Sequence, residues 1–322
     1  MSDTSTEPTS GYKPPEGVPI PVIYAWPPRP LAALRWLSTS FLFPMGAVYI
    51  GLAVVTWTYL TPNLEDMAVL APGWMAMIWL RNASLLIVFA GGLHWWLHMR
   101  RAQGRAYKYE SRWLAKNNPK FLWRNQARDN MFWSLVSGCT IWSIFEGLTF
   151  WAYANDLIPQ VTWSEAPAYL SMVVFASFFW GTFHFYWVHR WLHWHPLYRL
   201  AHELHHRNVD VGPWSGISMH PVEHVIYFSG LFIWWIVPAD PIVLILTGFF
   251  YGLSPALSHS GFDKLMLSNQ KNMTLGLYFH QLHHQYFEVN YGQLLTPVEK
   301  LYGTWAGTAE EAQAILQRRR EI

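Results

Sequence analysis

Four apolar stretches, each about as long as a lipid bilayer is thick, constrain the fold of this chain more than any other feature. They cover residues 41–60, 82–98, 131–153 and 168–188. A helix needs about 20 apolar residues to cross the hydrocarbon core, and about 17 at the least. The second stretch is short, but Arg81 at its start can extend its charge to the interface. The sequence therefore predicts four transmembrane helices.

A fifth apolar region, residues 225–253, is interrupted by the segment Pro238-Ala239-Asp240-Pro241. Each half is too short to cross a bilayer alone, and proline breaks a continuous helix. We therefore expect an interfacial helical hairpin that dips part-way into the membrane.

The composition excludes several classes of protein. Asp, Glu, Lys and Arg make up 13% of the 322 residues, against about 25% in an average soluble domain, which is too little charge to cover a soluble surface. The single cysteine, Cys139, excludes an internal disulfide and a four-cysteine metal or iron–sulfur site. The net charge of +2 excludes an extended basic field for nucleic acid. The 15 histidines are the part of the composition that needs a functional explanation.

Basic residues are distributed unevenly among the loops. The segment 99–130 holds nine Lys and Arg residues, whereas the loops at 61–73 and 154–167 hold none. Because basic loops stay in the cytoplasm, both termini and the 99–130 loop are expected there. Everything after residue 188, including most of the histidines, then lies on the cytoplasmic side of a multi-pass integral membrane protein.

This topology divides the chain into four parts. We expect a disordered, Pro-rich N-terminal tail over residues 1–40 and a four-helix transmembrane region over residues 41–188. A cytoplasmic His-rich helical cap follows over residues 189–305 and includes the hairpin, and a C-terminal tail covers residues 306–322. The predicted fold class is an all-α integral membrane protein.

Histidines recur at helical spacing in the cap. Residues 189–193 read His-Arg-Trp-Leu-His, residues 202–206 read His-Glu-Leu-His-His, and residues 280–284 read His-Gln-Leu-His-His. Positions i, i+3 and i+4 share one face of a helix, so each His-x-x-His-His box is expected to present three imidazoles together. With the isolated His259, the candidate metal ligands are His189, His193, His202, His205, His206, His259, His280, His283 and His284. Imidazole suits iron, zinc, copper and nickel. Nine donors exceed what one tetrahedral ion can use and would serve two ions with four to five ligands each.

Some polar residues have simpler interpretations. We expect His195 to be a hydrogen-bonded core or interface residue. His94 and His98 either form a polar helix end or support the metal site. Glu146 lies inside the third span, where a carboxylate is either functional or, beside Gly147, part of helix packing.

Two short motifs leave a zinc metalloprotease open as an alternative. Residues 202–206 fit the His-Glu-x-x-His pattern through His202, Glu203 and His206, and residues 220–224 fit the inverted His-x-x-Glu-His pattern. A protease would leave the whole 280–284 box unused, however. A metal transporter or metal-binding scaffold is a third reading, but its boxes would follow the spans, where no pore would run.

Residues 184–305 resemble the sterol desaturase and fatty acid hydroxylase superfamily of integral-membrane, histidine-ligated di-iron oxygenases. Residues 186–193 match the Tyr-Trp-x-His-Arg-x-x-His box of that family, and residues 202–223 match its second box and the His-Pro-x-Glu element that follows. His259 fits the isolated histidine of the family. Residues 280–304 fit its closing box with the later Asn-Tyr-Gly and Gly-Thr elements.

The resemblance implies two iron ions, no haem or flavin in the chain, and O₂-dependent hydroxylation or desaturation of a C–H bond in a sterol, a fatty acyl chain or a related lipid. It also implies a separate electron donor of the ferredoxin or cytochrome type with its reductase. The basic 99–130 loop faces the right compartment to dock an acidic donor, although it could serve only topology or contact anionic headgroups. Possible additional ligands, or hydrogen-bonding partners of the ligands, are His184, Glu203, His220, Glu223, His224 and Asn290.

Overall fold

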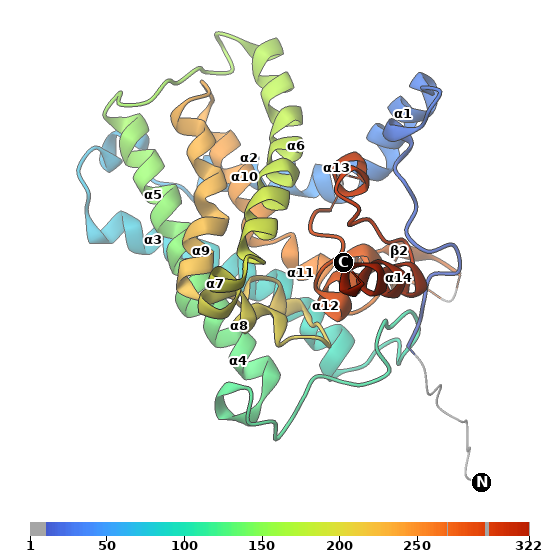
Figure 1. Ribbon diagram of the computed structural model, residues 1–322. Helices are drawn as coiled ribbons and strands as arrows, with labels where there is room; N and C mark the ends of the chain where they lie inside the picture. The colour runs from blue at the N-terminus through green and yellow to red at the C-terminus, as the bar shows by residue number, and fades with distance from the viewer. Residues whose placement is uncertain (1–10, 269, 294–295, 322) are drawn as a thin grey trace.

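The computed structural model describes residues 11–268, 270–293 and 296–321, and these residues are mostly helical (Figure 1). One small antiparallel sheet, formed by β1 (Lys264–Met266) and β2 (Asn272–Thr274), is the exception. The helices are α1 (Pro30–Trp36), α2 (Met45–Tyr59), α3 (Pro72–Leu86), α4 (Gln126–Phe132), α5 (Thr140–Ala154), α6 (Pro167–Leu192), α7 (His195–Leu197), α8 (Glu203–His206), α9 (Pro221–Phe228), α10 (Pro241–Gly252), α11 (Pro255–Ser258), α12 (Tyr278–Tyr286), α13 (Thr296–Leu301) and α14 (Ala309–Arg320). The predicted all-α membrane fold class is confirmed.

Within the described residues, four helical segments are long and apolar enough to cross a membrane. They are Pro72–Met99, Gln126–Ala154, Pro167–Leu192 and Pro241–Ser258. The predicted number of about four is confirmed, but the first predicted span, residues 41–60, is not among them. It corresponds to α2, which together with Pro30–Phe41 forms a pair bent by 56° that passes the same test as a unit. Pro44, which has no backbone N–H to continue a helix, lies at this bend.

The second span begins at Pro72, ten residues earlier than predicted, so Arg81 lies inside it rather than at its end. Arg81 is buried and donates from Nη2 to Oε1 of Glu146 and from Nη1 to Thr61. Asn82 donates from Nδ2 to Oε2 of Glu146 at 2.9 Å. Hydropathy alone placed the start of this span directly after Arg81. In the structure Arg81 lies within the span, and Glu146 on α5 neutralises its charge. Glu146 therefore has a packing role, as one of its two predicted interpretations proposed.

The predicted hairpin at residues 225–253 is present as two helical legs, α9 with the 3₁₀ turn Ser229–Trp235, and α10. Asp240 caps α10 by accepting the backbone N–H of Ile242 at 3.1 Å. Together with α11, the second leg is long enough to cross a membrane, and 78% of its most apolar window is buried. It is buried because α2, α5 and α6 pack around it.

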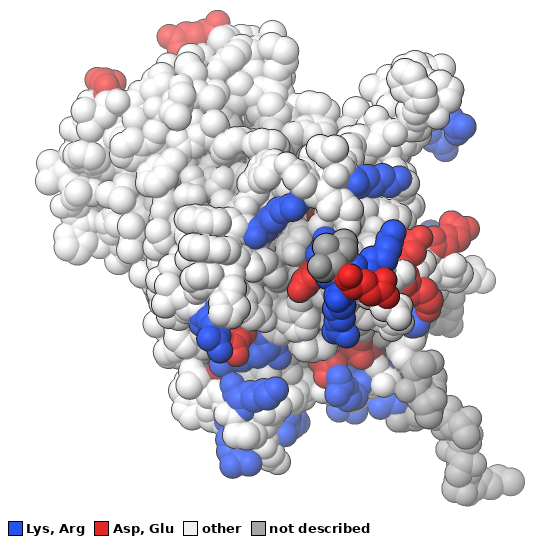
Figure 2. Space-filling view, viewed as in Figure 1, with Lys and Arg blue, Asp and Glu red and all other residues white. Residues whose placement is uncertain are grey.

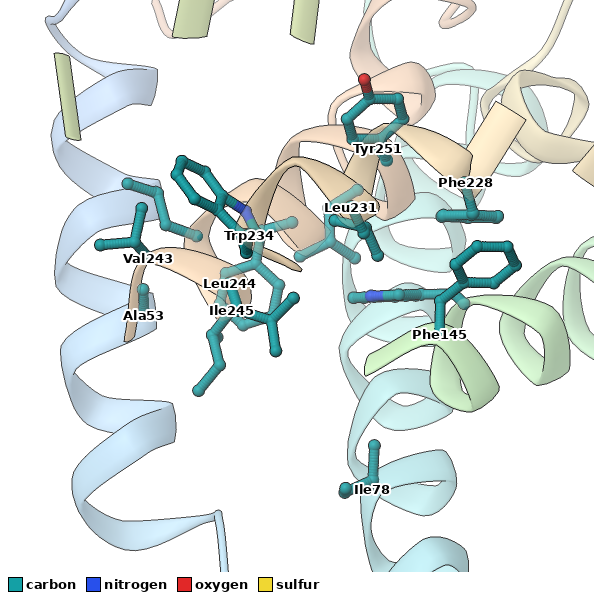
Figure 3. Packing of buried hydrophobic residues seen from close by; sticks show 14 of the residues in the cluster. Ala53, Ile78, Phe145, Phe228, Leu231, Trp234, Val243, Leu244, Ile245 and Tyr251 are labelled. Carbon is teal, nitrogen blue, oxygen red and sulfur yellow. The ribbon is translucent and has the colours of Figure 1, made fainter. Parts of the chain in front are cut away.

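The core of this helical bundle is aromatic and aliphatic (Figure 3). The Trp142 side chain on α5 is fully buried and packs between Phe228 on α9 and Phe249 on α10. A Cβ atom at Gly252 would lie 2.5 Å from the indole ring of Trp142. The absence of a side chain there lets α10 approach α5 closely enough to bury the tryptophan.

Charged side chains are segregated along the long axis of the bundle (Figure 2). Small acidic patches mark the upper left of the view, whereas Lys and Arg residues, mixed with further acidic residues, gather in the lower and right parts, and a broad uncharged band separates them on the left. The lower end contains α8, α12 and the 99–130 loop (Figure 1). A multi-pass membrane protein with its histidine boxes near one end of the spans has this arrangement.

The two predicted tails differ from expectation in their described parts. Residues 11–40 follow a defined path that includes α1, and the backbone N–H of Val18 donates to the carbonyl of Gly307 at 2.9 Å. Residues 1–10 of the predicted disordered tail lie outside the described residues. Residues 306–321 include α14, whose Ala312 and Ile315 are buried against the cap. Apolar contacts hold both segments, through Tyr12 and Val18 in the first and through Ala312 and Ile315 in the second.

Candidate metal centre

The nine predicted histidines come together in two groups at the lower end of the bundle. Group one consists of His189, His193, His202, His206 and His283. Group two consists of His205, His259, His280 and His284. Within each group the potential ligand nitrogens lie within 4.8 Å of one another. The structure thus supports two separate ligand sets of five and four imidazoles.

Each group is assembled from distant segments of the chain. His189 and His193 are one turn apart at the C-terminal end of α6, and His259 directly follows α11. The 202–206 box lies at the junction of a π-helical turn with α8, and the 280–284 box lies in α12. Gly261, with a φ of 82°, lets the chain turn away just after His259.

Each box contributes to both groups, which differs from the expectation that its three imidazoles act together. In the first box His202 and His206 belong to group one and His205 to group two. In the second box the assignment is reversed, with His283 in group one and the other two in group two. The cause is the helical geometry, because positions i and i+4 point in nearly the same direction while position i+3 diverges.

The imidazole nitrogens within each group are very close. Nε2 of His193 lies 3.1–3.2 Å from Nε2 of His202, His206 and His283. In group two, the three distances among Nε2 of His259, His280 and His284 are 3.0–3.2 Å. Two nitrogens bound to one metal at about 2.1 Å lie about 3.0 Å apart at a right angle and about 3.4 Å apart at a tetrahedral angle. The observed spacing falls in this interval.

The other ring nitrogen of several of these histidines identifies the tautomer. Nδ1 of His189 donates to the carbonyl of Tyr291 at 2.6 Å, and Nδ1 of His283 donates to the carbonyl of Val289 at 2.6 Å. Nδ1 of His259 donates to the carbonyl of Pro255 at 3.0 Å. A carbonyl can only accept, so the proton is on Nδ1 and Nε2 offers a lone pair.

These lone pairs need a cation. One proton can satisfy one nitrogen pair, but it cannot satisfy three mutual contacts that include the unprotonated Nε2 of His259. Among the described residues, the buried Nε2 of His189 has no hydrogen-bond partner. A metal ion in each group would satisfy all of these nitrogens at once, so the donor set fits two nitrogen-preferring metal ions.

Burial also keeps the imidazoles ready to bind metal. It lowers the pKa of His205 to about 4 and the pKa of His206 and His283 well below the usual 6.5. The cause is desolvation, which disfavours the charged imidazolium. Near neutral pH these side chains are therefore uncharged, and no proton has to leave before a metal binds.

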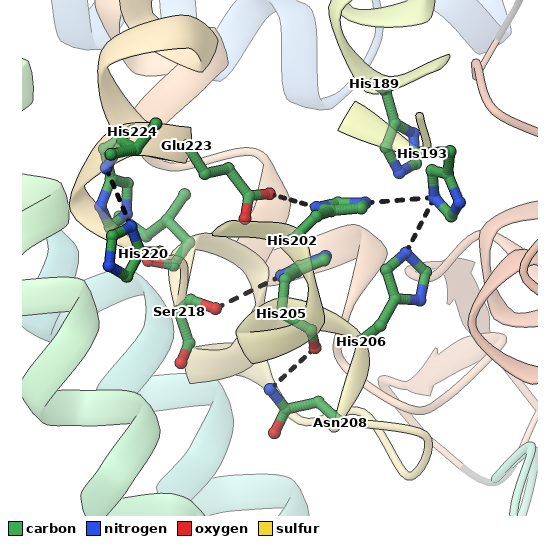
Figure 4. Close-up of polar contacts among 12 residues, drawn as sticks. His189, His193, His202, His205, His206, Asn208, Ser218, His220, Glu223 and His224 are labelled. Atoms are coloured by element: carbon green, nitrogen blue, oxygen red, sulfur yellow. Dashed lines mark hydrogen bonds and ion pairs between the residues drawn. The ribbon is translucent and has the colours of Figure 1, made fainter. Parts of the chain in front are cut away.

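Glu223 is the carboxylate that contacts the site (Figure 4). It is buried on α9, and its Oε1 accepts from Nδ1 of His202 at 2.7 Å. Burial raises the pKa of Glu223 above its usual value, and a dication on the far side of the imidazole opposes this shift. A carboxylate behind a ligating histidine fixes the ring and increases its basicity.

Replacing Glu223 with alanine should weaken metal binding about 10–100-fold, because His202 loses the partner that orients it. Glu223→Gln should cost less, since the amide oxygen can still accept the Nδ1 proton. The measurement is a chelator titration followed by metal analysis. Glu203→Ala is the matched control, because Glu203 is an exposed carboxylate beside the same box. Equal losses for Glu203→Ala and Glu223→Ala would contradict the assignment.

The other predicted candidates lie outside both groups. His220 caps α9 by accepting the N–H of Val222 at 3.2 Å. His224 contacts Ser137 and the carbonyl of Ile217. His184 contacts Ser229 and Tyr251, and Asn290 bonds the backbone of Phe279 and Ala306.

Two further features near the centre were harder to predict from the sequence, namely the pair of His94 and His98 and the backbone carbonyls that accept from the candidate ligand histidines. His94 and His98 stack on each other, and Nε2 of His98 lies 2.9 Å from the carbonyl of Ser260, beside His259. They border the centre without joining it. The backbone carbonyls of Tyr291, Val289 and Pro255 were not predicted, because a carbonyl acceptor leaves no mark in a sequence.

The protease motifs do not assemble. Glu203, which would act as the general base of His-Glu-x-x-His, is exposed. It does not line the small cavity that borders both groups of histidines. His205 from the same box faces the second group instead. In the inverted motif, His220 caps a helix and His224 bonds a backbone carbonyl, so the two do not converge on one ion.

A cavity of about 20 Å³, enough for a water-sized molecule, borders both groups. His189 and His202 of group one and His205, His259 and His280 of group two line it. Its remaining wall is largely apolar and includes Phe185, Val188, Leu192, Met219 and Tyr227. A small molecule and an apolar carbon could therefore approach both groups from one side.

Comparison with known proteins identifies the same region. The fatty acid hydroxylase family model matches residues 174–304. The chain is 32% identical over 121 residues to the Delta(7)-sterol 5(6)-desaturase of Gibberella zeae, which covers 37% of this chain and 34% of that protein. It is also 32% identical over 121 residues to the enzyme of the same name from Saccharomyces cerevisiae, covering 37% and 32%. The Aspergillus fumigatus enzyme is 31% identical over 153 residues, covering 44% and 40%.

The match therefore spans about a third of the length of the first two relatives. No solved structure matches the chain significantly. The matched region contains all nine histidines of the two groups, together with most of α6 and all of α8 and α12. These matches confirm the family resemblance that the histidine boxes indicated. Residues 174–304 match the fatty acid hydroxylase family and are similar to sterol desaturases.

Proposed function

We propose that this protein is a membrane-bound di-iron oxygenase that uses O₂ and external electrons to hydroxylate or desaturate a C–H bond of a lipid. The observation that carries the proposal is the pair of imidazole groups, five and four, whose unprotonated nitrogens converge beside one cavity. The family match and the similarity to sterol desaturases support the choice of iron and of a lipid substrate.

Two iron ions held by these groups would supply the O₂ chemistry that a C–H bond requires. The chain's own residues do the rest. Phe185, Val188 and Leu192 form an apolar wall beside the two groups, against which a hydrocarbon can pack. Glu223 orients His202 through Oε1, while its Oε2 has no hydrogen-bond partner among the described residues. Glu223 lines the cavity, where its carboxyl group can hold a proton beside the reacting carbon.

The location of the centre suits a lipid substrate. His189 and His193 are at the end of α6, where a span of 26 residues reaches about 39 Å and so passes the limit of a hydrocarbon core about 30 Å thick. A lipid can therefore stay in the bilayer while one carbon reaches the cavity. By the positive-inside rule this end is cytoplasmic, and both chain termini are placed there too.

The proposal is tested by metal analysis and lipid chemistry together. Purified protein should hold two irons per chain, and cells lacking the gene should lack an oxidised lipid that wild-type cells contain. Comparative lipid mass spectrometry, with ¹⁸O₂ labelling to trace an inserted oxygen, identifies both the lipid and the carbon. One zinc per chain, with no O₂-dependent lipid change, would refute it.

Glu203→Gln separates the oxygenase from the metalloprotease. Since Glu203 is exposed and makes no contact with the cavity, the variant should retain both metals and at least about half of wild-type O₂-dependent turnover, because surface substitutions usually have small effects. A protease using His202, Glu203 and His206 would lose its general base and all activity. Turnover and metal content of the variant are the two measurements.

A further inference from the structure

An exposed tryptophan precedes α4, in a segment rich in basic residues. Trp123 is 63% exposed and the adjacent Leu122 is 39% exposed. Four exposed cations flank them in the sequence, Lys116, Lys120 and Arg124 in the loop and Arg128 in the first turn of α4. We call these six residues the basic-aromatic patch. Residues 111–128 contain no Asp or Glu, so no acidic side chain of this segment offsets the charge.

The loop is held in a fixed shape. Asn117, Trp123 and Arg124 have positive φ angles of 59°, 51° and 56°, a conformation that residues other than glycine adopt rarely and at a cost. Nη2 of Arg124 donates to the carbonyl of Asn117 at 3.1 Å, and Lys116 pairs with Asn125 through a backbone bridge. A charge excess needed only for topology would not require this shape.

Hydrogen bonds connect the patch to the metal centre. Arg207 directly follows His206, and its guanidinium donates to the carbonyl of Lys120 at 3.1 Å and to the buried Asp129. The same Asp129 accepts from the backbone N–H of Leu122 at 3.0 Å. Arg207 therefore connects the patch to His206 of group one, because it follows His206 in the chain and pairs with Asp129.

The patch lies outside the membrane. The segment Gln126–Ala154 has 29 residues and is about 44 Å long, about 14 Å longer than a hydrocarbon core. The excess lies at the Gln126 end, because that first turn carries the exposed Arg128 while the exposed apolar side chains begin at Met131. Trp123 precedes this end. An anchor in the lipid interface would lie closer to the apolar band.

We propose that the basic-aromatic patch is the docking surface for an acidic one-electron carrier protein. This inference rests on the proposed function, because hydroxylation consumes one lipid C–H bond, one O₂, two electrons and two protons, and it forms one hydroxyl group and one water. A one-electron carrier must then dock twice for each turnover. Basic rims speed the approach of acidic partners, and an exposed tryptophan is a typical interface anchor.

The test measures binding rather than turnover. The full chain, in nanodiscs of zwitterionic lipid, is titrated with a small acidic [2Fe–2S] ferredoxin as the probe, at about 20 mM and about 200 mM salt. We expect binding to weaken with salt. The triple variant Lys116→Glu/Lys120→Glu/Arg124→Glu should raise Kd at least about tenfold, and Trp123→Ala should raise it about tenfold.

The matched control reverses three exposed cations elsewhere, in Lys271→Glu/Arg318→Glu/Arg320→Glu, and should change Kd less than about twofold. Unchanged thermal stability and metal content show that each variant folds. Equal Kd values for the patch and control variants would overturn the inference. Loss of binding to anionic nanodiscs in the patch variants, with ferredoxin binding intact, would assign the patch to lipid headgroups instead.

This design distinguishes a failure of the docking proposal from a failure of the proposed oxygenase function. Probe binding is measured on metal-loaded protein and reports on the patch alone, since no patch residue belongs to either group. Iron content and O₂-dependent turnover with a small chemical reductant test the oxygenase without the patch.

Discussion

The double variant His206→Ala/His283→Ala should retain one of the two metal ions with wild-type affinity. These residues are far apart in sequence and come from different boxes, but both belong to group one. The variant His205→Ala/His206→Ala should weaken both ions, although its two changes are adjacent in sequence and lie in one box. Loss of a ligand should cost more than the 10–100-fold typical of an outer hydrogen-bond partner, so we expect at least about a hundredfold loss of affinity for each affected ion.

A chelator titration with metal analysis distinguishes these outcomes. The His206/His283 variant should lose one ion at low chelator and the second at the wild-type concentration. The His205/His206 variant should lose both ions early, in a shifted curve. His195→Ala is the control, because His195 is exposed and belongs to neither group. If the two double variants gave the same curve, the division into groups of five and four would be wrong.

Turnover should fall to about 1% or less in both double variants, because two ions and their ligands act as one unit and effects within such a unit do not add. The His283 change alone should have nearly the same effect on turnover. A metalloprotease that used only the 202–206 box would survive this change.

The second large effect concerns stability. Glu146→Leu should destabilise the protein by about 3–5 kcal/mol, because it leaves the buried Arg81 guanidinium without its counter-charge. The double variant Arg81→Met/Glu146→Leu should recover most of this loss, since apolar side chains of similar volume can replace a buried ion pair. The measurement is unfolding in mixed micelles, with thermal midpoint as a second readout.

Glu165→Gln provides the matched control for this pair. It removes one carboxylate from an exposed loop between α5 and α6, where the Glu165 side chain accepts from the backbone N–H and the hydroxyl of Thr162. Its effect should stay below about 0.5 kcal/mol. If Glu146→Leu were as mild as this control, or if the double variant were worse than the single one, the Arg81–Glu146 pair would not stabilise the bundle.

The sequence predicted which histidines come together because imidazole chemistry and helical spacing are both local. His202, His205 and His206 share a helix whatever the rest of the chain does, and nine donors already indicated two ions of four to five ligands. The distribution between ions was not predictable in the same way. It depends on how α8 faces α12, which is fixed by contacts between segments more than seventy residues apart.

The membrane region shows the same limit. Hydropathy located the apolar segments, but it began the second span only after Arg81. A window of residues cannot detect a partner such as Glu146 on another helix. It also interpreted residues 225–253 as an interfacial hairpin. The second leg, α10, is instead enclosed by neighbouring helices, and close approach at Gly252 made room for Trp142.

Because each box contributes histidines to both groups, two bound ions would hold the helices of the cap together. The helices that carry the boxes are short, four residues in α8 and nine in α12, and isolated helices of this length are marginal in water. Two ions would cross-link α6, α8, the turn after α11 and α12 at a single point. Loading of the ions and ordering of the cap are then one equilibrium, so that starvation for metal would loosen the reactive end of the protein while its membrane-embedded half stayed folded.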